Sequence, residues 1–118
     1  MNIELLRNYC INKKGVTEEF PFDETTLVFK VMNKMFALTD LVDNMSVNLK
    51  CKPDLIIKLR EEYPDTVLPG YHMNKKHWNV IKFDDRIEDK KIFEWIDNSY
   101  DLVVMKLTKK DKEKLKAL

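Results

Sequence analysis

The sequence predicts an α+β fold with a largely antiparallel sheet and helices packed on one side of it. Two segments rich in β-branched and aromatic residues flank a short turn, which is the pattern of a β-hairpin. Other segments keep the three- and four-residue apolar spacing of amphipathic helices. The expected order is helix, β-hairpin, strand, helix, strand, helix, helix, which is typical of an α+β protein.

Length and composition indicate one soluble domain, 1–118, that ends in a basic helix or tail at 109–118. With 44% apolar residues and only two glycines, the chain can fill one core and has no room for a long linker. Its 21 Lys and Arg residues nearly balance its 20 Asp and Glu residues, so the formal net charge is +1. A nucleic-acid-binding role would therefore depend on local clusters of basic residues.

The first helix is expected to begin after Asn2, whose side chain can cap it, with Glu4 placed favourably in the first turn. Gly15 is expected to end this helix as a C-terminal cap. The apolar residues of the helix form one stripe: Leu5, Leu6, Tyr9 and Cys10. An extended, proline-containing connector, 18–23, follows, and we expect its two phenylalanines to plug one end of the core.

A β-hairpin is predicted at Thr25–Val31 and Met35–Asp40, which flank the turn Met32-Asn33-Lys34. Asparagine tolerates the positive φ angle that a tight hairpin turn requires. A third strand is expected at Ser46–Cys51, where apolar and polar residues alternate. The residues of this strand expected to face the core are Val47, Leu49 and Cys51.

Further signals place the remaining elements. Pro53 suits the first turn of a helix, and Pro64 follows the end of that helix. A fourth strand is marked by Trp78, Val80 and Ile81. A long helix is expected to begin at Glu88 or Asp89, and Thr108 can cap a short helix at the end of the chain.

The stretch between the turn signals Leu68–Gly70 and Asp84–Asp85 holds both histidines of the chain, His72 and His77. A zinc site needs three or four protein ligands, and the chain has no third histidine. A structural or hydrogen-bonding pair is therefore favoured over a metal site. We expect neither a metal nor a cofactor.

Cys51 is a candidate for catalysis, because the ammonium groups of Lys50 and Lys52 can lower the pKa of a thiol. Strand alternation, however, predicts that Cys51 is a core residue. Because no C-x-x-C unit occurs, we expect Cys10 and Cys51 to be two reduced structural thiols. No nucleophile-elbow or phosphate-binding glycine motif is present, so the expectation is a protein that is not an enzyme.

Basic residues near the predicted turns and strand ends are candidates for contacts with a phosphate backbone. The candidate DNA-binding residues are Lys30, Lys34, Lys50, Lys52, Asn74, Lys75 and Lys76. The opposing interpretation is that Lys is common at exposed turns because it is well solvated there, and composition alone favours it. The mixed charges of the C-terminal segment are explained by a solvated helix, and a nucleic-acid contact there is the weaker alternative.

Six segments carry a family resemblance that spans nearly the whole chain. They are Gly15–Phe22, Leu27–Val31, Lys34–Leu38, Val47–Cys51, Pro69–Trp78 and Ser99–Val104. In order and at natural spacing, they resemble the MmcQ/YjbR family of small bacterial proteins. The resemblance implies a CyaY-like fold and a DNA-binding role in which two projecting, hairpin-like wings contact the duplex. On this chain the wings correspond to the turn at Lys34 and the loop Asn74–Lys76, and a central family motif corresponds to Tyr71, His72 and Trp78.

Two departures from the family pattern concern these wings. The first hairpin of the family usually turns through Gly-Gly, where this chain has Met32-Asn33. Asp84–Asp85 replaces a typical Asp-Gly turn and adds negative charge near the expected DNA face. The CyaY-like fold also resembles frataxins, which bind iron through an acidic first helix. The first helix here carries only Glu4 as an acidic residue, so iron binding is not expected.

The resulting hypothesis is a protein that binds double-stranded DNA weakly, with low sequence specificity and strong salt dependence. The alternative is a protein- or small-ligand-binding module that uses the surface of Tyr71, His72, His77 and Trp78. Residues 1–14 lack the apolar run of a signal peptide, and no apolar stretch is long enough to span a bilayer. We therefore expect a cytoplasmic protein without membrane contact, and we expect a monomer.

Overall fold

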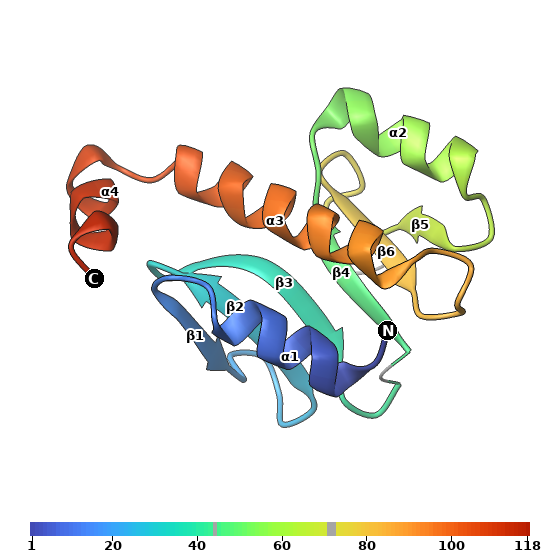
Figure 1. The fold of residues 1–118 in the computed structure, drawn as a ribbon, viewed down its shortest axis with the longest axis horizontal. Helices are drawn as coiled ribbons and strands as arrows, with labels where there is room; N and C mark the ends of the chain where they lie inside the picture. The colour runs from blue at the N-terminus through green and yellow to red at the C-terminus, as the bar shows by residue number, and fades with distance from the viewer. Residues whose placement is uncertain (44, 71–72) are drawn as a thin grey trace.

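A six-stranded sheet forms the centre of the fold in the computed structural model, which describes residues 1–43, 45–70 and 73–118 (Figure 1). In chain order, the elements of these ranges are α1 (Ile3–Ile11), β1 (Val16–Glu19), β2 (Thr26–Val31), β3 (Lys34–Asp40), β4 (Ser46–Lys50), α2 (Pro53–Glu62), β5 (Val67–Pro69), β6 (Trp78–Lys82), α3 (Asp89–Met105) and α4 (Lys109–Lys116). None of the helices in these ranges is both long and apolar enough to cross a membrane.

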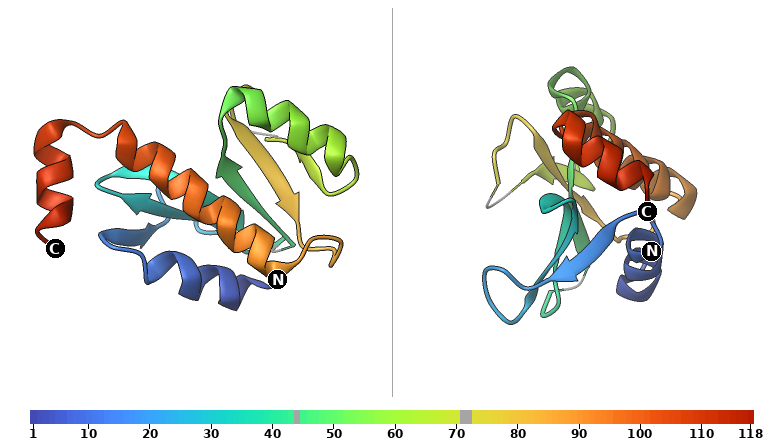
Figure 2. Two further views of the ribbon diagram at one scale, coloured as in Figure 1. Left: turned by 45° about the horizontal axis from the view of Figure 1, so that its top comes forward. Right: turned by 90° about the vertical axis from the view of Figure 1, so that its left-hand side faces the viewer.

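The strand order is β1-β2-β3-β4-β6-β5, and every neighbouring pair is antiparallel. Helices α1 and α3 lie side by side on one face of the sheet, and α2 lies beside β5 and β6 (Figures 1 and 2). The predicted α+β fold, with an antiparallel sheet and helices on one side, is therefore confirmed. Because the sheet is antiparallel, the turns and strand ends at either end of it combine residues from distant parts of the chain.

The core lies between the sheet and the long helix α3. Phe29 on β2, Val47 on β4 and Ile96 on α3 are fully buried. Burial of each such side chain stabilises the fold by about 1.5–3 kcal/mol before the cost in conformational entropy. Phe36 on β3 meets the ring of Tyr100 on α3 edge to face, with ring centroids 5.4 Å apart. These contacts hold α3 across the strands that carry the candidate site.

Local signals in the sequence place several element ends correctly. Asn2 caps α1, because its Oδ1 accepts a hydrogen bond from the N–H of Leu5 over 2.9 Å. Thr108 caps α4 in the same way, with its Oγ1 accepting the N–H of Asp111 over 3.1 Å. Pro53 is the first residue of α2, as predicted. Capping depends on side chains only two or three residues away, so sequence reasoning finds it reliably.

Two strands were not predicted. β1 overlaps the first two residues of the segment 18–23, which was expected to be an extended connector. β5 overlaps Leu68–Gly70, which was expected to be a turn. Both strands are short, and each lies at an edge of the sheet. Each forms because a longer adjacent strand supplies backbone hydrogen-bonding groups. Val16 on β1 pairs with Val31 on β2, and Val67 on β5 pairs with Ile81 on β6. A segment of three or four residues is too short to show the sequence pattern of a strand, so these two strands could not be predicted from sequence.

Three features of the N-terminal region differ from the predictions. The helix α1 ends earlier, with Asn12 as its C-cap, and Gly15 instead occupies the turn into β1 with a φ of +74°. Phe20 and Phe22 are 49% and 64% exposed, so they do not plug the core. Leu5, assigned to the apolar stripe, is 42% exposed because α1 buries only a narrow face against the sheet.

Candidate functional site

Six of the seven candidate phosphate-contacting residues lie toward the same end of the sheet. Lys34 is the first residue of β3, and Lys50, the last residue of β4, pairs with Trp78, the first residue of β6. Because these neighbouring strands are antiparallel, the β2–β3 turn, the end of β4 and the start of β6 share one end. We call this the basic end; its candidate residues are Lys34, Lys50, Lys52, Asn74, Lys75 and Lys76.

The β2–β3 hairpin corresponds to the expected first wing, and its two-residue turn precedes Lys34. Met32 and Asn33 have φ angles of 50° and 67°, as the two central residues of a type I′ turn do. The turn therefore forms without the Gly-Gly that is usual in the family. Lys34 is exposed, whereas Lys30 is half-buried and its Nζ lies 3.7 Å from Oε1 of Glu19. The Glu19 carboxylate thus competes with any phosphate for Lys30.

The second wing is the β5–β6 hairpin, in which residues 70–77 connect the two paired strands. The Oδ1 of Asn74 accepts the N–H of Lys76 over 2.9 Å, and the carbonyl of Asn74 accepts the N–H of His77 over 3.0 Å. These bonds shape the turn before β6 and leave the side chains of Lys75 and Lys76 exposed. Among the described residues, no hydrogen bond is found from the side-chain amide nitrogen of Asn74, which can donate to an acceptor.

Arg60 on α2 donates hydrogen bonds to the β5–β6 connection and to β6. One of its terminal nitrogens donates to the carbonyl of Lys75 over 2.5 Å and to the carbonyl of Trp78 over 3.2 Å. Its Nε donates to Oδ1 of Asn79 over 2.7 Å. Sequence reasoning did not select Arg60, because nothing in a helical residue fifteen positions earlier indicates contact with this loop. The contact fixes the backbone of the loop at Lys75 and at the start of β6.

Lys50 and Lys52, which flank Cys51, differ in exposure. Lys50 is half-buried, and burial together with the ammonium group of Lys106 lowers its pKa. Lys52 is exposed and precedes α2 without capping it. An anion placed between two nearby positive charges reduces the repulsion between them.

None of the ion pairs found among the described residues includes the exposed lysines of the basic end: Lys34, Lys52, Lys75 and Lys76.

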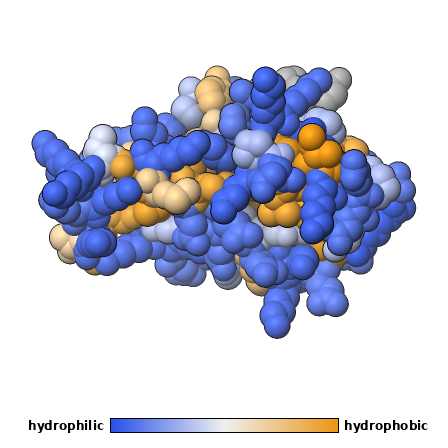
Figure 3. All heavy atoms as spheres, turned by 90° about the horizontal axis from the view of Figure 1, so that it is seen from above, coloured by the Kyte–Doolittle hydropathy of each residue, from blue (hydrophilic) through white to orange (hydrophobic). Residues whose placement is uncertain are grey.

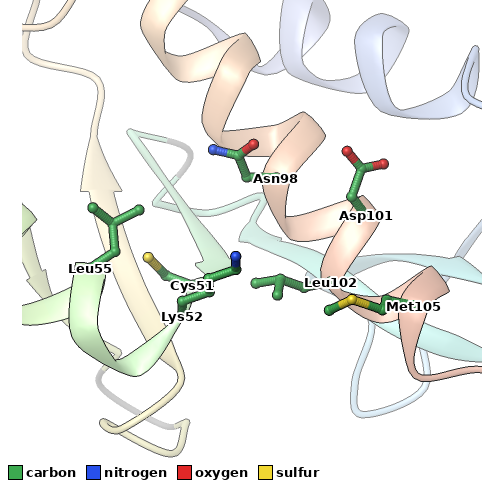
Figure 4. Close-up of a pocket in the computed structure, with 7 residues that line it drawn as sticks. All are labelled: Cys51, Lys52, Leu55, Asn98, Asp101, Leu102 and Met105. Atoms are coloured by element: carbon green, nitrogen blue, oxygen red, sulfur yellow. The ribbon is translucent and has the colours of Figure 1, made fainter.

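A cavity of about 330 Å³ opens beside Lys52, between α2 and α3 (Figure 4). The residues that line it are Cys51, Lys52, Leu55, Asn98, Asp101, Leu102 and Met105. Cys51 lies just beyond the last residue of β4 and is half-buried, so the prediction of a core residue is only partly correct. Burial raises the pKa of its thiol, and a protonated thiol is a poor nucleophile. Burial therefore disfavours the thiolate form of Cys51.

The aromatic surface of the alternative hypothesis is described only in part. Tyr71 and His72 lie outside the described residues, and so does the predicted His72–His77 pair. His77 is half-buried, and Trp78 is 8% exposed, which leaves little of its ring for a ligand. Among the described residues, no group of three or more His, Cys, Asp or Glu side chains is placed to hold a metal ion.

Carboxylates gather at the opposite end of the sheet, which we call the acidic end. Asp40 is the last residue of β3, and Asp43 follows it in the β3–β4 connection. Asp84 and Asp85 follow the end of β6, and the φ of 63° at Asp85 confirms a turn there. The sequence interpretation placed these two residues near the DNA face, but β6 carries them to the end away from Lys75. Two basic residues also lie at this end: Lys82, the last residue of β6, and Arg86, which pairs with Asp84.

A larger cavity, of about 560 Å³, lies on the face of the sheet that no helix covers. Its apolar lining comes from Leu38 on β3, Val80 on β6, Phe22 and Met73. Asp23, Asp40 and Asp43 also line it. This cavity is unsuited to phosphate because its charged groups are carboxylates, so it is not part of the basic end.

The fold defines a small α+β protein with a six-stranded antiparallel sheet and helices packed against it. The chain belongs to the YjbR family, because the family model YjbR matches residues 11–102. The uncharacterized protein YjbR of Escherichia coli K12 is 34% identical over 116 residues, which cover 98% of this chain and 97% of that protein. The uncharacterized protein YyaQ of Bacillus subtilis is 32% identical over 76 residues, covering 64% and 63%. The predicted family membership is confirmed.

Solved structures agree with this assignment. The crystal structure of Deinococcus radiodurans protein DR2400, with its DUF419 domain, is 38% identical and superposes with a TM-score of 0.89. The superposition covers 97% of this chain and 87% of that one. A crystal structure of a Pseudomonas syringae protein is 24% identical, covers 86% and 98% of the two chains, and has a TM-score of 0.70, which shows the shared fold alone. These relatives are bacterial proteins.

Proposed function

We propose that this protein is a cytoplasmic, non-enzymatic DNA-binding protein that contacts the backbone of double-stranded DNA through its two wings. The observation that carries the proposal is that Lys34, Lys52, Lys75 and Lys76 lie toward one end of the sheet and are all exposed. No carboxylate among the described residues pairs with these ammonium groups. Binding to phosphates would release the counterions of the duplex, which is the main source of sequence-independent affinity.

All three arginines donate hydrogen bonds within the protein, which supports low sequence specificity. Arginine reads guanine through a bidentate contact in the major groove, and this common specific contact requires a free guanidinium. Arg7 donates to Glu18 over 2.6 Å, and Arg86 donates to Asp65 over 3.1 Å. Arg60 is occupied by the backbone of the second wing. The wings therefore offer lysines, which contact phosphates as point charges without reading bases.

The test is fluorescence anisotropy of a labelled duplex, titrated with protein at several salt concentrations. About four phosphate contacts give a slope of about −4 in a plot of log K against log salt. We expect Lys34→Glu and Lys75→Glu/Lys76→Glu to weaken binding and flatten the slope. The matched control is Lys90→Glu/Lys91→Glu, an adjacent, exposed lysine pair at the start of α3, outside both wings.

Binding that falls steeply with salt, and that the wing variants lose while the control keeps it, would support the proposal. Absence of binding at low salt, or equal binding by the wing and control variants, would overturn it. In that case, the Tyr71–Trp78 surface becomes the next candidate, with a protein or small molecule as the ligand.

A further inference from the structure

The C-terminal helix α4 carries a strong local excess of positive charge. It contains five lysines, Lys109, Lys110, Lys112, Lys114 and Lys116, and two acidic residues, Asp111 and Glu113. The whole chain has a net charge of only +1, so the rest of the molecule is net negative. None of the ion pairs found in the described part of the chain involves α4. Figure 3 shows hydrophilic side chains over the end of the molecule that α4 forms.

The helix is fixed to the fold rather than left as a free tail. Leu115 is 6% exposed, and its Cδ1 lies only 2.5 Å from the position that a Cβ would take at Gly15. The Nζ of Lys14 donates to the carbonyl of Lys116 over 2.9 Å. In turn, the carbonyl of Lys14 accepts the hydroxyl of Tyr100 on α3 over 2.6 Å. These contacts bind α4 to the turn between α1 and β1.

That docking places α4 beside the first wing. Gly15 directly precedes β1, and its neighbour Val16 pairs with Val31, the last residue of β2 before the wing turn. A Cβ at Gly15 would also lie 3.8 Å from the side chain of Val31. The views in Figures 1 and 2 agree that the C-terminal helix lies at the same end of the molecule as the β2–β3 turn.

We infer that α4 is a third contact element for the DNA backbone, continuing the basic end beyond the first wing. The inference rests on the proposed function and assigns it a region that lies outside the family match at 11–102. A helix of eight residues is about 12 Å long, which spans about three phosphates of one strand. Lysines spaced along such a helix contact phosphates without reading bases, so α4 adds affinity and salt dependence but no sequence specificity.

The test removes charge from α4 without removing the helix. Lys109→Gln/Lys110→Gln/Lys114→Gln/Lys116→Gln keeps residues of good helix propensity and retains Leu115. The matched control is Lys58→Gln/Lys82→Gln/Lys90→Gln/Lys91→Gln, which removes the same charge from exposed lysines outside the wings and α4. Circular dichroism and thermal unfolding verify that both variants fold. Both are titrated against a labelled duplex beside the wild-type protein and Lys34→Glu.

We expect the α4 variant to bind about tenfold more weakly than the control at low salt, with a salt slope smaller by about 2. Equal affinity and slope for the α4 variant and the control, with binding lost in Lys34→Glu, would overturn the inference and leave the wings as the binding site. Absence of binding by the wild-type protein would overturn the proposed function, and the inference with it.

Discussion

The hydroxyl of Ser99 on α3 donates a hydrogen bond to the backbone carbonyl of Phe36 on β3 over 2.6 Å. The same oxygen accepts the N–H of Lys50, at the end of β4, over 2.8 Å. The β3–β4 ladder reaches only to the pair Ala37 and Leu49 at this end of the sheet. Ser99 therefore satisfies backbone groups just beyond the ladder and ties both strands to α3 at the base of the basic end.

Substitution of Ser99 by alanine is expected to destabilise the protein by about 2–4 kcal/mol, because it leaves two buried backbone groups without partners. Ser99 is fully buried, so water cannot readily replace the hydroxyl. Urea denaturation followed by circular dichroism measures the change in unfolding free energy. The control is Asn98→Ala at the exposed neighbouring position, which is expected to stay within about 0.5 kcal/mol of wild type. A loss of similar size in both variants would contradict the role assigned to Ser99.

The turn that docks α4 depends on the absence of a side chain at Gly15. Gly15→Ala is expected to cost about 1–2 kcal/mol, because its φ of +74° disfavours any residue with a Cβ. The new methyl group would also displace Leu115 and loosen α4. Thermal unfolding measures the loss, and Thr17→Ala, at an exposed position of β1, serves as the control. An unchanged melting temperature would show that the turn does not require glycine.

Alkaline pH is expected to destabilise the fold through Cys10. Burial raises the pKa of this thiol to about 12, whereas an unfolded cysteine ionises at about 8.5. Above that lower value the unfolded state binds fewer protons than the folded state, so the free energy of unfolding falls as pH rises. One proton contributes at most about 1.4 kcal/mol per pH unit. The stability difference between wild type and Cys10→Ala, measured by urea denaturation, should shrink from pH 8 to pH 11. A constant difference would contradict the raised pKa.

Lys30 and Lys34 lie on the same hairpin, but we expect them to differ in DNA binding. Lys30 is half-buried and faces Glu19, whereas Lys34 is exposed and unpaired among the described residues. Lys34→Gln should reduce the salt slope by about 1, as expected for a lost phosphate contact. Lys30→Gln should leave the slope nearly unchanged, and its ion pair contributes at most about 1 kcal/mol to stability. Fluorescence-anisotropy titrations of both variants measure the two salt slopes. Equal reductions in slope would contradict this prediction and show that Lys30 also contacts phosphate.

Local segments of the chain specify some features of this fold, and contacts between distant segments specify the others. Sequence alone determined the fold class, the β2–β3 hairpin and the helix caps at Asn2 and Thr108. Each of these depends on contacts between residues a few positions apart, or on apolar spacing that local segments display by themselves. The exposure of Lys34, Lys75 and Lys76 also agrees with the sequence prediction, because turns were recognised from the same local signals.

Tertiary structure decided the rest. The edge strands β1 and β5 form only because neighbouring strands supply hydrogen bonds, and Arg60 and Ser99 act on residues far away in the chain. The gathering of the lysines at one end, with Asp84 at the other, follows from antiparallel strand order. Pairing and packing between distant segments are set by the burial of the whole core, which no short segment of sequence encodes.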